Sequence, residues 1–120
     1  MMMKKMNTGL AILILATAVA GMAQGKKVTL TGHLVDQMCG AGVKNSAKAA
    51  EHTKECALMD HCANTGFGIF ANGKYIKFDA EGSKRAKALA EKTTKDLDIQ
   101  IVVEGTQDGD NVIVSSIKEK

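Results

Sequence analysis

Residues 66–79 read GFGIFANGKYIKFD and decide the fold of this chain. Two runs rich in apolar residues flank Asn72-Gly73, a pair whose backbones tolerate the positive φ angles of a two-residue hairpin turn. The turn predicts antiparallel strands over 66–71 and 74–79, with residues paired outward from it. In that register one face carries four side chains that we expect in the core: Phe67, Ile69, Ile76 and Phe78.

The opposite face of this hairpin carries Phe70 and Tyr75 beside Lys77. Two neighbouring aromatic side chains on an open sheet face form an apolar patch, which usually marks a contact with another element or with a partner. The pattern therefore predicts either a helix that covers this face or a binding face made of Phe70, Tyr75 and Lys77.

Further elements follow on both sides of the hairpin. Apolar and polar residues alternate over 28–35, as in a half-buried strand. A helical stripe runs over 83–92, with Ser83 as the expected N-cap. Two more alternating runs, 99–105 and 112–117, lie on either side of an Asp-Gly turn and predict a second hairpin.

The resulting order is strand, cysteine-bearing segment, hairpin, helix, hairpin. It predicts a mainly β protein: a five-stranded OB-like barrel with two short helices. One helix belongs to an insertion at about 37–65, between strands 1 and 2, and the other lies between strands 3 and 4. OB barrels commonly bind through the connection between their first two strands, so we expect the chemistry of this chain in its insertion.

Motifs spread over nearly the whole mature chain resemble a family of small exported bacterial OB-like domains with a Cys/His-containing insertion. The resemblance implies an exported barrel and supplies neither a substrate nor catalytic residues. The motifs that carry it are Thr31-Gly32-His33-Leu34-Val35-Asp36, Cys39-Gly40, His52, Cys56-Ala57, Cys62, Gly66, Gly68, Gly73-Lys74-Tyr75 and Lys77-Phe78-Asp79.

The start of the chain is typical of a secretory signal peptide. Lys4 and Lys5 precede an uninterrupted apolar run over 10–16, and small residues follow up to Ala23. We expect cleavage after Ala23, which defines a signal peptide over 1–23 and one domain over 24–120. The apolar run is too short for a comfortable membrane span, so we expect a periplasmic or secreted product with no stable membrane anchor after cleavage.

The charge of the mature domain argues against a nucleic-acid partner. Loss of Lys4 and Lys5 reduces the 16 basic residues to 14, against 13 acidic residues, so the formal charge falls from +3 to +1. Nucleic-acid binders draw most of their affinity from clustered Lys and Arg side chains. We therefore expect no nucleic-acid partner, and a protein or a metal ion remains as the expected partner.

The insertion gathers the side chains that favour soft metal ions. Thiolates and imidazoles suit zinc or copper(I), and nearby methionines favour copper(I) slightly. We expect one helix from Ser46 toward Asp60, with His52 and Cys56 one turn apart on one stripe. The candidate metal ligands are Cys39, His52, Cys56, His61 and Cys62.

Two other hypotheses apply to the same cysteines. In an exported domain, one disulfide among Cys39, Cys56 and Cys62 would stabilise the fold by about 2–4 kcal/mol without any metal. A Cys/His-dependent enzyme is more remote, because five short strands leave little room for a substrate cleft. The sequence thus favours a binding or interaction module, with a structural domain as the alternative and no assigned catalytic residue.

Overall fold

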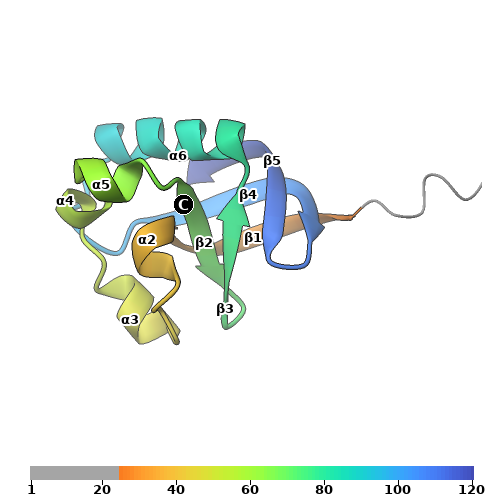
Figure 1. Cartoon of the computed structure of the whole chain (residues 1–120), viewed down its shortest axis with the longest axis horizontal. Helices are drawn as coiled ribbons and strands as arrows, with labels where there is room; N and C mark the ends of the chain where they lie inside the picture. Colours follow the sequence, from red (N-terminus) through yellow and green to blue (C-terminus); the bar gives the residue numbers. More distant parts are fainter. Residues whose placement is uncertain (1–24) are drawn as a thin grey trace, which may run out of the picture.

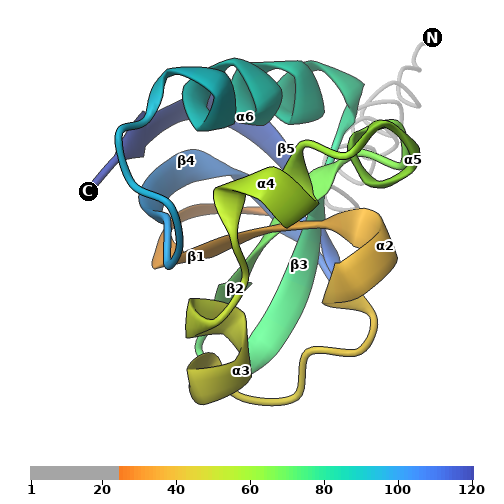
Figure 2. The same cartoon turned by 90° about the vertical axis from the view of Figure 1, so that its left-hand side faces the viewer.

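The computed structural model describes residues 25–120, and Figure 1 shows their arrangement. The elements in chain order are β1 (Lys26–Asp36), α2 (Gln37–Gly40), α3 (Ser46–Ala50), α4 (Lys54–Ala57), α5 (Asp60–Ala63), β2 (Phe67–Ala71), β3 (Lys74–Phe78), α6 (Ala80–Lys92), β4 (Gln100–Asp108) and β5 (Asn111–Glu119). The four short helices α2 to α5 make up the insertion, which lies at one end of the barrel (Figures 1 and 2). The predicted signal peptide lies outside the described residues.

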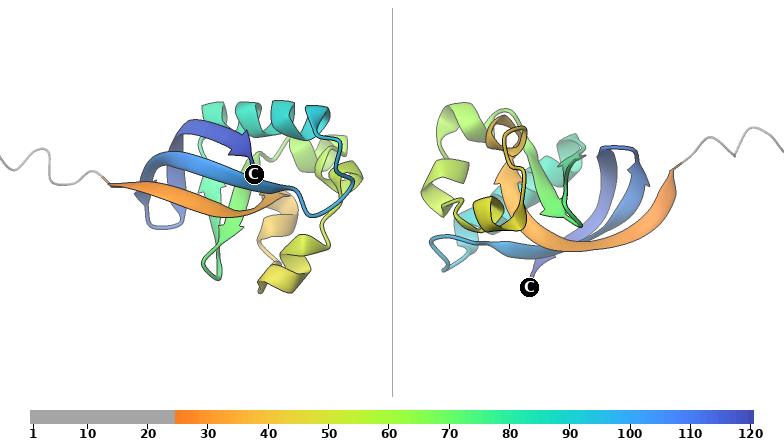
Figure 3. Two further views of the ribbon diagram at one scale, coloured as in Figure 1. Left: turned by 180° about the vertical axis from the view of Figure 1, so that it is seen from behind. Right: turned by 90° about the horizontal axis from the view of Figure 1, so that it is seen from below.

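The five strands close into a barrel in the order β1-β2-β3-β5-β4. Neighbouring strands are antiparallel except β3 and β5, which pair in parallel through Lys77 with Asn111 and Phe78 with Val112. β1 is the longest strand and curves so that it pairs with both β4 and β2 (Figure 3). The sequence-based expectation of a mainly β, five-stranded barrel is confirmed.

The hairpin of β2 and β3 has the predicted register. Ile69 lies opposite Ile76, and Phe70 lies opposite Tyr75. Asn72 and Gly73 have φ angles of 54° and 79°, as the expected tight turn requires. The four predicted core side chains are all buried: Phe67, Ile69, Ile76 and Phe78.

β1 passes from β4 to β2 at Gly32 and His33. His33 pairs with Gln100 of β4 and with Phe70 of β2. A Cβ atom at Gly32 would lie 2.1 Å from the carbonyl oxygen of Phe70, so only glycine allows the two backbones to approach this closely. Beyond this crossing, β1 continues to Asp36 and delivers the insertion to one end of the barrel.

The helix after β3 begins earlier than the sequence indicated. α6 starts at Ala80, and its N-cap is Asp79, whose carboxylate accepts a hydrogen bond from the backbone N–H of Gly82. The expectation of Ser83 as the N-cap is wrong, because the Ser83 hydroxyl accepts instead from the backbone N–H of Phe67. α6 packs its small side chains Ala86 and Ala90 on the barrel.

The insertion does not contain the single helix expected from Ser46 toward Asp60. Three short helices stand there, and the first two begin at a side-chain cap: Asn45 caps α3 and Thr53 caps α4. The breaks occur because backbone groups bond elsewhere: Lys54 donates to the carbonyl of Asp96, and the carbonyl of His52 accepts from Asp98. The segment before β4 therefore fixes the link between α3 and α4, and His52 lies in that link.

Within residues 25–120, no helix is both long enough and apolar enough to cross a membrane.

Candidate metal centre

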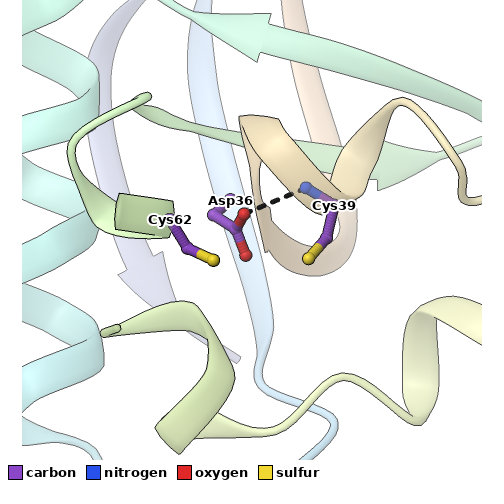
Figure 4. Close-up of side chains that lie close together, drawn as sticks. All are labelled: Asp36, Cys39 and Cys62. Carbon is purple, nitrogen blue, oxygen red and sulfur yellow. Dashed lines mark hydrogen bonds between the residues drawn. The ribbon is translucent and has the colours of Figure 1, made fainter. Parts of the chain in front are cut away.

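Two of the three cysteines meet a buried carboxylate where α2, α5 and the end of β1 come together. The Sγ atoms of Cys39 and Cys62 and a carboxylate oxygen of Asp36 all lie within 4.8 Å of one another. Figure 4 shows both sulfur atoms directed toward the space beside the Asp36 carboxylate. We call Asp36, Cys39 and Cys62 the thiol-carboxylate group.

Asp36 occupies the centre of this group because of its place in the chain. It is the last residue of β1 and the N-cap of α2, and its side chain is fully buried. Oδ2 accepts a hydrogen bond of 3.0 Å from the backbone N–H of Cys39. The carboxylate thus fixes the first turn of α2 and, with it, the position of the Cys39 thiol.

The second oxygen of Asp36 is held by His52. The distance from His52 Nε2 to Asp36 Oδ1 is 2.8 Å, and both side chains are largely shielded from solvent. Burial disfavours the ionised carboxylate, but the hydrogen bonds from His52 and Cys39, with the charge of His52, outweigh burial and lower the pKa of Asp36. An ionised carboxylate only accepts hydrogen bonds, so Nε2 of His52 carries the proton.

The Cys39 thiol is held in its protonated form in the absence of a cation. Burial, the negative charge of Asp36 and the neighbouring Cys62 together raise the pKa of Cys39 to about 11. A thiol with such a pKa is a weak nucleophile at neutral pH. In addition, His52 faces Asp36 and His33 Nδ1 lies 2.8 Å from Asp98, so neither of these histidines is paired with a cysteine as a Cys/His enzyme requires.

Cys62 is buried, and two contacts tie its helix to α2. The backbone N–H of Met38 donates to the Thr65 hydroxyl oxygen at 3.0 Å, and the same hydroxyl donates to the carbonyl of Cys62 at 2.7 Å. The thioether sulfur of Met38 lies 3.8 Å from Cys62 Sγ. Residues from α2 and α5 are therefore held together by backbone contacts as well as by their sulfur atoms.

Tyr75 supports α2 from the barrel side. Its hydroxyl donates to the carbonyl of Val35 at 2.9 Å, and its ring packs against Gly40, the last residue of α2. Phe70 is buried beneath α3, in a small cluster with Val35 and Ala49. The hypothesis of a binding face made of Phe70, Tyr75 and Lys77 is therefore wrong for the two aromatic residues, which the insertion covers, and only Lys77 is exposed.

The cysteines are not bridged. Cys39, Cys56 and Cys62 are all free thiols and do not lie at disulfide distance, which corrects the expectation of one disulfide. Their places in the fold explain this: Cys56 is exposed on α4, away from the thiol-carboxylate group. The breaks around α4 separate Cys56 from the stripe that the sequence predicted.

The five predicted metal ligands therefore divide into three sets. Cys39 and Cys62 come together. His52 contacts the group through Asp36 and not through a sulfur atom. Cys56 and His61 are exposed and stand outside the group.

Sequence reasoning missed the role of Asp36. An aspartate that follows a predicted strand usually forms a turn, so its residue type alone does not indicate a site. The available signal was its spacing, because an N-cap aspartate three residues before a cysteine accepts a hydrogen bond from that cysteine's backbone.

No family, curated protein or solved structure matches this chain.

Proposed function

We propose that this protein is an exported OB-like module that binds one soft metal ion, zinc or copper(I), between α2 and α5. Cys39 and Cys62 supply the two thiolate ligands, and Asp36 positions the first of them. The observation that carries the proposal is the approach of both Sγ atoms and the Asp36 carboxylate to within 4.8 Å of one another. A buried thiol and a partly buried thiol beside a buried carboxylate are an arrangement that a cation stabilises.

The geometry of the two sulfur atoms is compatible with such an ion. Zinc–sulfur bonds of about 2.3 Å at a tetrahedral angle place two sulfur ligands about 3.8 Å apart. A nearly linear copper(I) dithiolate would hold them somewhat farther apart. The side chains of Cys39 and Cys62 therefore need only a small adjustment to hold either ion.

The electrostatics of the group also support metal binding. The Cys39 thiol loses its proton with difficulty because burial, the charge of Asp36 and the neighbouring Cys62 all raise its pKa. A metal cation reverses this effect, because it binds the thiolate and displaces the proton. The ion then gives the buried Asp36 carboxylate a positive neighbour in addition to its hydrogen bond with His52.

The fold, the N-terminal sequence and the net charge support the other parts of the proposal, which are the OB-like fold, the export and the class of partner. The closed five-stranded barrel, with its parallel pair of β3 and β5 and an insertion between β1 and β2, supports the OB-like part of the proposal. The signal-like sequence over 1–23 supports export to the periplasm or beyond. The near-neutral mature charge supports a metal ion or a protein as the partner.

Metal titration of cysteine variants tests this function. The protein is expressed from its full sequence, reduced, freed of metal, and titrated anaerobically with Zn²⁺ or with Cu(I). After desalting, elemental analysis should find one equivalent bound in the wild type and in C56S. Cys39→Ser and Cys62→Ser should each lose most of the bound metal, because each removes one thiolate.

The exposed Cys56 makes C56S a matched control, since it removes a thiol without touching the thiol-carboxylate group. A wild-type protein that retains neither metal overturns the proposed function and favours a structural domain. Equal metal loss in all three variants overturns the assignment of the ligands.

A further inference from the structure

We propose that Met38 is a third ligand and makes the site selective for copper(I) over zinc. This inference rests on the proposed metal site at Cys39 and Cys62. The observation that carries it is the contact between Met38 Sδ and Cys62 Sγ, at 3.8 Å. Met38 thereby adds a thioether to the two thiols, and we call Met38, Cys39 and Cys62 the sulfur triad.

Met38 does not occupy this position as a core residue. Its side chain is 50 % exposed, whereas Cys62, which it contacts, is 5 % exposed. A methionine that fills a gap in a hydrophobic core is buried on most sides. Met38 instead forms the boundary between solvent and the buried thiol, which is where an arriving ion would first meet a sulfur atom.

The backbone fixes this arrangement. Met38 precedes Cys39 in α2, and its N–H donates to the side chain of Thr65, which in turn bonds the carbonyl of Cys62. The thioether is thus held near α5 while the neighbouring thiol belongs to α2. The triad therefore draws its three sulfur atoms from two helices joined through one threonine.

The donor types decide between the two metals. A thioether is a neutral, soft ligand that favours copper(I), an ion that is satisfied by two or three sulfur ligands. Zinc requires four ligands and favours thiolate, imidazole or carboxylate donors. Both oxygens of Asp36 already accept hydrogen bonds, from His52 and from Cys39, so the carboxylate is less available to complete a zinc site.

Affinity measurements on two methionine variants test the inference. Met38→Leu keeps the size of the side chain but removes the thioether. Met59→Leu is the matched control, because Met59 is also an exposed methionine of the insertion and stands outside the triad. Cu(I) affinity is measured under anaerobic reducing conditions against a chromophoric copper(I) chelator, and Zn²⁺ affinity against a zinc-binding dye.

We expect M38L to weaken Cu(I) binding about tenfold or more and to change Zn²⁺ binding less than about twofold. M59L should change neither. X-ray absorption at the copper edge should count three sulfur neighbours in the wild type and two in M38L.

The outcomes separate this inference from the function on which it rests. Equal Cu(I) affinities of M38L and M59L, or equal weakening of both metals in M38L, overturn the role of Met38 while the thiolate site stands. A wild type that binds neither metal overturns the site itself.

Discussion

The carboxylate of Asp36 and the imidazole of His52 lie 2.8 Å apart and join the end of β1 to the link between α3 and α4. Asp36 also accepts from the backbone of Cys39, so the pair connects both halves of the insertion to one buried charge. This arrangement explains why the Cys39 thiol has a fixed position although α2 is only one turn long.

Removal of His52 should destabilise the fold. His52→Ala leaves Oδ1 of the fully buried Asp36 carboxylate without its hydrogen-bond partner, and an unsatisfied buried acceptor costs about 2 kcal/mol or more. Urea unfolding, followed by circular dichroism, measures the loss. His61→Ala is the control, because His61 is exposed and should change stability by less than about 0.5 kcal/mol. Similar midpoints for the two variants would contradict the role of the Asp36–His52 pair.

The protein should be less stable in acid, because protonation of Asp36 removes the contribution of its carboxylate. The pKa of Asp36 is lowered in the folded protein, so its contribution is fully present above the unfolded value of about 3.9 and is lost as the pH falls through the folded value. Urea midpoints from pH 6 downward should therefore decrease below about pH 4. Asp36→Asn should show a smaller decrease than the wild type, and parallel curves for both proteins would refute this explanation.

A methyl group at Gly40 should disturb α2. A Cβ atom there would lie 2.2 Å from the ring of Tyr75, which cannot turn away freely because its hydroxyl is bonded to Val35. We expect Gly40→Ala to lose about 1–3 kcal/mol, as for an overpacked core.

Gly42→Ala provides the comparison for Gly40→Ala, because its nearest neighbour would be at an ordinary contact distance of 3.7 Å. Thermal or urea unfolding should show little change for this variant. A loss in Gly42→Ala as large as that in Gly40→Ala would mean that the Tyr75 contact is not the cause.

The metal-free Cys39 thiol should respond to pH as a group with a raised pKa. Burial, Asp36 and Cys62 raise the pKa to about 11, so thiolate is scarce at pH 8 and increases tenfold per pH unit up to about pH 10. Iodoacetamide labelling, resolved by peptide mass spectrometry, gives the rate at Cys39 alone. The rate should continue to rise through pH 10, and a plateau near pH 8 would contradict a raised pKa of Cys39.

The β elements could be predicted because their signals are local. The positive φ angles of Asn72 and Gly73 require the residue types that the sequence shows, and the turn then fixes the register of Phe70 opposite Tyr75. The sequence alone does not decide whether a helix or a partner covers this aromatic pair. The folded chain shows that the insertion covers it, with Ala49 of α3 packed against Phe70.

The insertion was less predictable because tertiary contacts override its helical periodicity. The backbone of Lys54 bonds to Asp96, more than 40 residues away, and this contact ends the continuity of the expected helix. These helix breaks also explain why the sequence predicts only part of the candidate site. Cys39 and Cys62 were named from residue type, whereas the exclusion of Cys56 and the inclusion of Asp36 depend on where the helix breaks.

Thiol protection by metal tests the central claim most directly. The reduced protein is labelled with a thiol reagent at matched times, with and without one equivalent of Cu(I) or Zn²⁺, and mass spectrometry assigns the label to each cysteine. The account predicts that metal slows labelling at Cys39 and Cys62 together and leaves Cys56 unchanged. Labelling rates at Cys39 and Cys62 that are the same with and without metal would contradict it, as would protection of Cys56 instead.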